Sequence, residues 1–63
     1  MKNNLRKFRW QKDWSQSRLS RKSGVLRSTI AAIESNDSAN PTIQNALLLA
    51  RALGTTVDEL FSL

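Results

Sequence analysis

The sequence predicts an all-α fold of five short helices, and three observations lead to this fold class. No segment shows the alternation of polar and apolar residues that is typical of a strand. Gly24 and Gly54 follow segments with helical periodicity, and a glycine can end a helix in a left-handed conformation. Ser15, Thr42 and Thr56 stand where helices would begin, and their hydroxyl groups can accept hydrogen bonds from the free amides of a first helical turn.

The five expected helices, with their caps, cover about residues 3–12, 15–23, 26–35, 42–53 and 56–61. The third helix is expected to start near Leu26 or Arg27. Residues 35–41 show no periodicity and are expected to form a loop. Thr56 and Glu59 have the spacing of a capping box for the last helix. The whole chain, residues 1–63, is expected to be one domain.

The apolar residues at helical spacing predict a single core. Its expected members are Leu5, Phe8, Leu19, Val25, Ile30, Ile33, Ile43, Leu47, Ala50, Leu53, Val57 and Leu60. In the fourth helix, the residues predicted to face the core are Ile43, Ala46, Leu47, Ala50 and Leu53.

The net charge of +5 is spread unevenly along the chain. Residues 1–27 hold nine Lys or Arg against Asp13 alone, which makes this part +8. Residues 28–63 hold Arg51 against four acidic residues, which makes that part −3. A one-sided basic surface on a small domain is typical of a protein that binds the phosphate backbone of nucleic acid. The alternative is a solvated surface that keeps the protein soluble.

Several function classes are disfavoured by what the sequence lacks. Without cysteine or histidine, neither a disulfide nor a structural zinc site is expected. No pair of a nucleophile and a base suggests an enzyme, and no cofactor or small-molecule ligand is expected. The longest apolar run, residues 46–50, is too short to cross a bilayer, and the N-terminus lacks the apolar stretch of a signal peptide. We therefore expect no membrane partner, and we expect the protein to be cytoplasmic.

Residues 16–35 indicate a function, because they have the pattern of two helices joined by a tight turn. Leu19 is the apolar residue of the first helix, and Gly24 provides the bend. Ile30 and Ile33 of the second helix would face back onto the first. The outer side chains of the second helix then lack a partner within the domain, and such a helix matches the width of a DNA major groove.

A longer pattern extends from about residue 4 to residue 62. It is carried by Leu5, Phe8 and Arg9, and by the segments SQSRLSRKSGV (15–25), STIAAIE (28–34) and NPTIQNALLLARALGTTVDELF (40–61). In these residues the sequence resembles the Cro/phage-repressor-type (Xre-like) helix-turn-helix proteins. The resemblance implies a compact five-helix, lambda-repressor-like DNA-binding domain whose second and third helices form the helix-turn-helix.

The resemblance also implies roles for individual residues. The residues that match base-contacting positions are Arg27, Ser28 and Ala32. Arg27 suits bidentate pairing with guanine, and Ala32 suits contact with a thymine methyl group. The residues that match phosphate contacts are Gln16, Thr29, Ser35, Asn40 and Thr42. Arg9 and Glu34 match a pair that forms a salt bridge between the first and third helices, which would offset repulsion between Glu34 and phosphate.

Three positions depart from the family pattern. Ser20 replaces the usual alanine, which is tolerated if its hydroxyl bonds back to its own helix. Leu26 occupies the usual Ser or Thr cap of the third helix, so a weaker cap is expected, which Ser28 can supply one turn later. Asp37 stands in a loop that is often basic, and this should weaken backbone contacts on that side.

Trp10 lies on a face of the first helix that is usually polar, and two interpretations stay open. It is either an exposed anchor for a partner protein or a second copy, or a ring that lies over Arg6 or Trp14 on the domain's own surface. Trp14 is expected to pack against the core. Long-range steering of DNA and solvation, rather than direct contact, is expected for the basic residues of the second helix, Arg18, Arg21 and Lys22.

These features predict a bacterial or phage transcription regulator that binds double-stranded DNA, with repression by promoter occlusion as the simplest mechanism. A homodimer on a palindromic operator is expected, with two recognition helices about 34 Å apart. The apolar residues proposed for its dimer surface are Leu60, Phe61 and Leu63. The alternative is a protein-interaction module on the same fold, such as an antitoxin or an adaptor.

Overall fold

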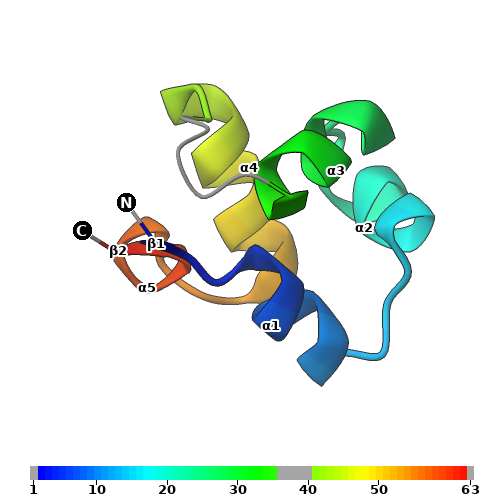
Figure 1. Cartoon of the computed structure of the whole chain (residues 1–63), viewed down its shortest axis with the longest axis horizontal. Coiled ribbons are helices and arrows are strands. Elements are labelled where there is room, and N and C mark those ends of the chain that lie inside the picture. The colour runs from blue at the N-terminus through cyan, green and yellow to red at the C-terminus, as the bar shows by residue number, and fades with distance from the viewer. Residues whose placement is uncertain (1, 36–40, 63) are drawn as a thin grey trace.

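The computed structural model describes residues 2–35 and 41–62, and within them it shows five helices and two short strands (Figure 1). In chain order these elements are β1 (Lys2–Asn3), α1 (Leu5–Gln11), α2 (Gln16–Ser23), α3 (Arg27–Ser35), α4 (Ile43–Leu53), α5 (Val57–Leu60) and β2 (Phe61–Ser62). α4 packs against both α2 and α5, while α3 packs against α2 and α1. The predicted all-α, five-helix class is confirmed.

Three helix starts follow the predicted hydroxyl caps. The side chain of Ser15 accepts a hydrogen bond from the Arg18 amide at 3.0 Å at the start of α2. Thr42 accepts from the Asn45 amide at 3.1 Å at the start of α4. At the start of α5, Thr56 accepts from the amide of Glu59, also at 3.1 Å. Each bond satisfies an amide that has no partner within its helix, so local chemistry fixes where these helices begin.

The two glycines end their helices as predicted. Gly24 follows α2 with φ of 81°, and Gly54 follows α4 with φ of 69°. Both values lie in the left-handed region, where a residue with a Cβ is strained.

The strands were not expected from the sequence. β1 and β2 pair antiparallel, with Lys2 opposite Ser62 and Asn3 opposite Phe61, and the pair joins the two ends of the described chain (Figure 1). Strands of two residues are too short to show a period of two, so no pattern indicates them. Because residues 2–3 pair with β2, α1 begins at Leu5 and not at about residue 3.

The core has the predicted composition except in α4 and at Phe61, which belongs to the core although it was not predicted there. Of the expected members, Leu5, Leu19, Ile30 and Leu60 are completely buried, and Phe8 and Val57 are half-buried against the core. The predicted inner face of α4 is wrong at Ile43, which is 82% exposed, and at Leu47, which is 45% exposed.

The buried face of α4 consists of Ala46, Leu49, Ala50 and Leu53. Leu49 is completely buried, although the sequence did not single it out. Residues 46–50 are apolar all round the helix, so periodicity alone does not select a face. Packing against α2 and α5 determines which face of α4 is buried.

The expected dimer surface at the end of the chain is also wrong for two of its three residues. Leu60 is completely buried and Phe61 is 8% exposed, because both side chains complete the chain's own core. Leu63 lies outside the described residues. In the part of the chain that the structure describes, no helix has the length and apolar character needed to cross a membrane.

Candidate nucleic-acid interface

The turn between α2 and α3, residues 24–26, is held by side-chain hydrogen bonds. The hydroxyl of Ser20 donates to the Val25 carbonyl at 2.6 Å, and the hydroxyl of Ser23 accepts from the Val25 amide at 3.1 Å. From the sequence, a bond from this hydroxyl back to its own helix is the condition for tolerating Ser20, and the structure shows a bond to the turn in its place. The chain reverses at Gly24 and brings the Val25 carbonyl within reach, so Ser20 ties α2 to the turn. This bond helps to set the angle between the two helices.

The outer face of α3 carries the predicted base-contacting residues. Ile30 and Ile33 are buried beneath it, whereas Arg27, Ser28 and Ala32 are exposed. One face of α3 therefore anchors the helix in the core, and the other presents a cation, a hydroxyl group and a methyl group to solvent. These are groups with which proteins contact base edges in a major groove.

A shallow hollow beside this face brings together residues from two helices. Ser28, Thr29 and Ala32 of α3 line one side of it, and Thr42 and Asn45 line the other side at the start of α4. Four residues predicted to contact DNA thus meet in one place.

Two further predicted phosphate contacts lie near or beyond the end of α3. Ser35 is exposed, and its hydroxyl donates to the Ala32 carbonyl at 3.3 Å. Asn40 lies outside the described residues, as does Asp37.

Arg9 and Glu34 form the ion pair that the family resemblance implies. Arg9 Nε lies 2.7 Å from Glu34 Oε2, and Arg9 Nη2 donates to Glu34 Oε1 at 2.9 Å, so the contact is bidentate. Arg9 Nη1 also donates to the Trp14 carbonyl at 2.8 Å. The pair therefore joins α1, the turn before α2, and the C-terminal part of α3, and it holds α3 at a defined orientation.

The Glu34 carboxylate is completely shielded from solvent yet remains charged. Burial alone would raise the pKa of Glu34. Hydrogen bonds from Arg9 and Gln16, the charge of Arg9 and a hydrogen bond from Arg6 outweigh burial, so the pKa of Glu34 lies below its ordinary value. The hydrogen bond to Glu34 raises the pKa of Arg9, and this effect outweighs burial, which by itself would lower that pKa. Glu34 therefore stays an anion whose charge is neutralised within the protein.

Gln16 takes part in the same cluster. Its side-chain amide donates to Glu34 Oε1 at 3.2 Å. A phosphate contact by this amide, as the resemblance implies, would compete with the bond to Glu34. Gln16 is also the first residue of α2, where backbone amides point out of the helix end toward an approaching anion.

A sequence model of helix-turn-helix proteins matches residues 5–60. The chain belongs to the helix-turn-helix family. It is of the Xre/Cro type and is a DNA-binding domain rather than an enzyme. Its structure is similar to the solution structure of the N-terminal DNA-binding domain of the master biofilm regulator SinR from Bacillus subtilis, with a TM-score of 0.88 and 31% sequence identity. The match covers 100% of this chain and 93% of the SinR chain. No curated protein matches the sequence.

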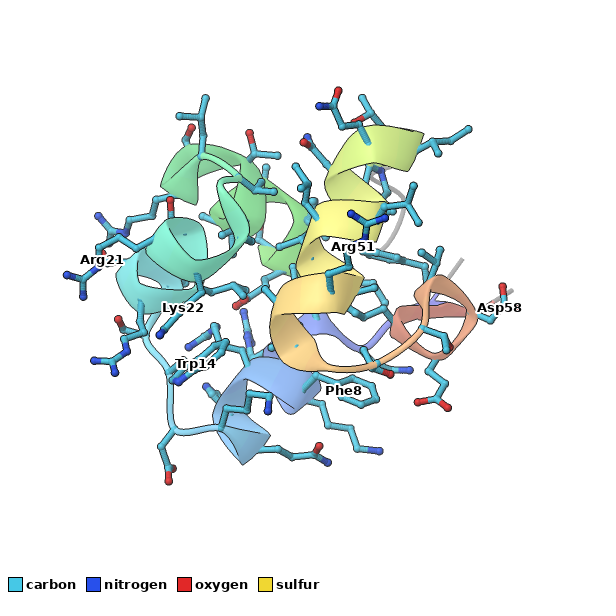
Figure 2. All side chains as sticks on the ribbon, turned by 180° about the vertical axis from the view of Figure 1, so that it is seen from behind. Phe8, Trp14, Arg21, Lys22, Arg51 and Asp58 are labelled. Carbon is cyan, nitrogen blue, oxygen red and sulfur yellow. The ribbon has the colours of Figure 1, made fainter. Side chains whose placement is uncertain are left out.

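The surface of this helix-turn-helix domain is basic on the side formed by α1 and α2. Its exposed cations include Lys7, Lys12, Arg18, Arg21 and Lys22. Arg21 projects from α2 into solvent, and Lys22 extends from α2 toward Trp14 on the same side of the molecule (Figure 2). Because Glu34 is neutralised internally, these cations contribute a positive potential around the helix-turn-helix.

The two tryptophans have different environments. Trp10 is 63% exposed, and the Arg6 guanidinium lies 5.9 Å from its ring centroid. The structure therefore shows the second interpretation of Trp10, in which its ring lies against Arg6 on the domain's own surface. Trp10 is still largely exposed, so a contact with a partner stays open as well. Trp14 is half-buried and packs against the core, as predicted. Lys12 and Lys22 lie 5.6 and 5.9 Å from its ring centroid.

Sequence reasoning missed two residues that support α3 in this helix-turn-helix domain. Arg6 Nε lies 3.4 Å from Glu34 Oε1, and its spacing of three residues from Arg9 places both arginines on one face of α1. That spacing is a signal from which Arg6 could have been predicted. The side-chain amide of Asn3 donates to the Ile33 carbonyl at 2.7 Å, near the end of α3. The two residues are thirty positions apart, and no local pattern indicates their contact.

Proposed function

We propose that this chain is a sequence-specific transcription repressor that inserts α3 into the major groove of double-stranded DNA. The observation that carries the proposal is the exposed row of Arg27, Ser28 and Ala32 on a helix whose opposite face is locked into the core. The similarity to a DNA-binding domain of a bacterial regulator supports the same function. Repression follows if the bound domain occludes a promoter, in the cytoplasm of a bacterium that carries the gene itself or on a phage.

Residues 1–63 act in this proposal as a single domain. The contacts divide into two groups by their chemistry. Arg27, Ser28 and Ala32 read base edges, and Arg27 pairs with guanine. Phosphate groups on either side of the groove are held by Gln16, Thr29, Ser35, Asn40 and Thr42. The second group fixes the position of α3, and the first group determines the preferred sequence.

The domain is proposed to bind as a homodimer, because two copies related by a two-fold axis place their α3 helices in successive major grooves about 34 Å apart. Since Leu60 and Phe61 are buried, the contact between copies requires another surface. Ile43 and Leu47 are four residues apart on α4 and are both exposed, so they offer an apolar strip for it.

The first test is selection from a randomised duplex library at about 150 mM salt, with the wild type and Arg27→Ala compared. The expected result is a palindromic motif, relaxed at one base pair in each half-site by the substitution. Loss of a bidentate guanine contact should cost about 1–3 kcal/mol at that base pair and little elsewhere. Arg51→Ala is the matched control, because it also removes one exposed cation, but from the last turn of α4.

A different outcome would contradict the proposal. Binding that depends on salt, yields no motif and is unchanged by Arg27→Ala would mean that only backbone charge is recognised. The second candidate, an antitoxin or adaptor, would then be favoured. The observation for it is a groove between α1 and the end of α3 where the exposed Trp10 lies beside Arg6 and Lys7. Such a groove suits an acidic protein segment with an apolar anchor.

A further inference from the structure

Leu26 holds an unusual position at the entrance to the recognition helix. It is the residue before α3, and its carbonyl accepts the hydrogen bond from the Ile30 amide at 3.0 Å that opens the helix. Its side chain is 72% exposed. Leu26 therefore occupies the N-terminal capping position of α3 and contributes little to the core.

A leucine at this position weakens the helix that it precedes. In α2, α4 and α5 the corresponding residues are Ser15, Thr42 and Thr56, and each accepts a hydrogen bond from the amide three residues later. Leu26 has no side-chain acceptor and cannot make such a bond. Capping positions strongly disfavour leucine relative to serine or threonine. Burial does not compensate for this loss, because the side chain projects into solvent.

Exposure alone would not distinguish Leu26, since single leucines on protein surfaces are common. The combination with a lost cap is different, because the residue lowers the stability of the helix and gains nothing from the rest of the chain. Positions that break a local rule without a compensating contact tend to serve a function. Leu26 also directly precedes Arg27 and Ser28, which are the first exposed residues of α3.

The chemistry of the major groove limits what a leucine can recognise there. A recognition helix contacts base edges with its N-terminal residues, so the residue before α3 enters the groove with them. Leucine neither donates nor accepts hydrogen bonds, which excludes polar contacts to phosphate or to base nitrogen and oxygen atoms. Among the groups that the four bases present in the major groove, the C5-methyl group of thymine is apolar.

We propose that Leu26 recognises the C5-methyl group of a pyrimidine in the major groove, at a base pair close to the one read by Arg27. This inference rests on the proposed function of the chain. In unmodified DNA the pyrimidine is thymine, and 5-methylcytosine presents the same group. Ala32 was assigned a thymine methyl group too, but it lies six residues further on, about 9 Å along a helix. The two side chains therefore reach different base pairs.

The test replaces single thymines in the selected operator by deoxyuridine, which removes the methyl group and keeps base pairing. Binding is measured for the wild type and for Leu26→Ser, and each protein's affinity for the thymine duplex is compared with its affinity for the deoxyuridine duplex. For the wild type, one position near the Arg27 base pair should show a loss of roughly fourfold, which corresponds to one buried methyl group. Leu26→Ser should show no loss at that position.

Two controls make the result specific. Leu26→Ser introduces a favoured cap, so its thermal midpoint should not fall below that of the wild type, and misfolding is excluded as a cause. Its sensitivity to deoxyuridine at the base pair read by Ala32 should be unchanged. In a second arm, cytosine or 5-methylcytosine is placed at the sensitive position. The wild type should prefer the methylated duplex, and Leu26→Ser should not distinguish the two.

The inference would be overturned if the wild type and Leu26→Ser lost the same affinity at every thymine, or if neither protein responded to deoxyuridine. The proposed function would survive both results, provided that selection yields a motif that Arg27→Ala relaxes. Selection without any motif would overturn the proposed function, and the role of Leu26 with it. The failures of the two proposals are thus distinguishable.

Discussion

At the scale of single residues, the cluster around Glu34 shows how one carboxylate organises several elements. Its two oxygens accept hydrogen bonds from the side chains of Arg9 and Arg6 in α1 and of Gln16 in α2. A buried ion pair adds little net stability, because removing both charges from water costs about as much as their attraction returns. Its contribution here is geometric, since the bidentate contact orients the C-terminal part of α3 relative to α1.

The cluster predicts a specific dependence of stability on pH. Because the fold lowers the pKa of Glu34 below its ordinary value of 4.5, the unfolded chain takes up a proton there first as the solution is acidified. The stabilisation by this carboxylate is present above that value and is lost as pH falls through the lower pKa of the folded state. Glu34→Gln should remove this part of the acid sensitivity. Urea denaturation at a series of pH values from about 7 to about 3 measures it.

Asp58→Asn is a suitable control for this experiment, because it removes an exposed carboxylate from α5. It should retain the wild-type loss of stability on acidification. At neutral pH, Glu34→Gln should be markedly less stable than the wild type, by about 3–5 kcal/mol, since Arg9 stays buried without its counter-ion. Parallel acid sensitivity of the wild type and Glu34→Gln would show that Glu34 does not hold its charge as described.

At the scale of elements, the turn between α2 and α3 determines how α3, the proposed recognition helix, is presented. Gly24 adopts φ of 81°, while Ser20 and Ser23 bond to Val25 from the α2 side. A short turn of this kind keeps the two helices in contact and leaves the outer face of α3 clear. If α3 enters the major groove as proposed, the turn acts on DNA binding through the orientation of α3.

Gly24→Ala should therefore weaken DNA binding more than its effect on stability explains. An added Cβ meets no atom within 4 Å, so the cost comes from the left-handed backbone and should be about 1–2 kcal/mol. Relief of that strain shifts the turn and, with it, α3. Thermal denaturation gives the loss of stability, and fluorescence anisotropy with a labelled operator gives the affinity at a temperature where the variant is fully folded.

Gly54→Ala is the matched control for Gly24→Ala. Gly54 has φ of 69° and equally open surroundings, but it ends α4 and does not adjoin α3. It should lose a similar amount of stability and keep nearly wild-type affinity. Equal losses of affinity in the two variants would mean that the turn at Gly24 has no special role in presenting α3.

At the scale of the whole molecule, charge is distributed so that one half of the domain attracts DNA. Residues 1–27 carry the positive excess, and residues 28–63 carry a small negative one. The exposed cations of α2 lie outside the predicted contacts, and we expect them to act on the rate of association by steering rather than on sequence preference.

Arg21→Gln should lower the association rate with the operator by roughly twofold at low salt, and this difference should vanish as salt screens the field. Arg51→Gln removes the same charge from α4, where Figure 2 shows the side chain on a different part of the molecule, and it should have a smaller effect. Stopped-flow measurements across a series of salt concentrations compare the two. An equal reduction by both variants would mean that net charge, and not its position, sets the rate.

The sequence by itself determined the features that depend on neighbouring residues. Ser15, Thr42 and Thr56 begin helices, and Gly24 and Gly54 end them, because capping bonds and backbone strain involve only a few consecutive residues. The helix-turn-helix and the outer face of α3 follow from the same local rules together with the family resemblance. Most of the core was predicted too, since isoleucines at helical spacing such as Ile30 and Ile33 leave one face to bury.

Only the tertiary structure decided the features that depend on distant residues. Leu49 rather than Leu47 faces the core, because α4 is apolar on more than one face and its packing against α2 and α5 determines which face is buried. Leu60 and Phe61 are buried in that core, so their side chains are not available for a dimer surface. The β1–β2 pair and the bond from Asn3 to Ile33 join residues far apart in sequence. Such contacts arise only when the chain has closed on itself, and a local pattern carries no signal for them.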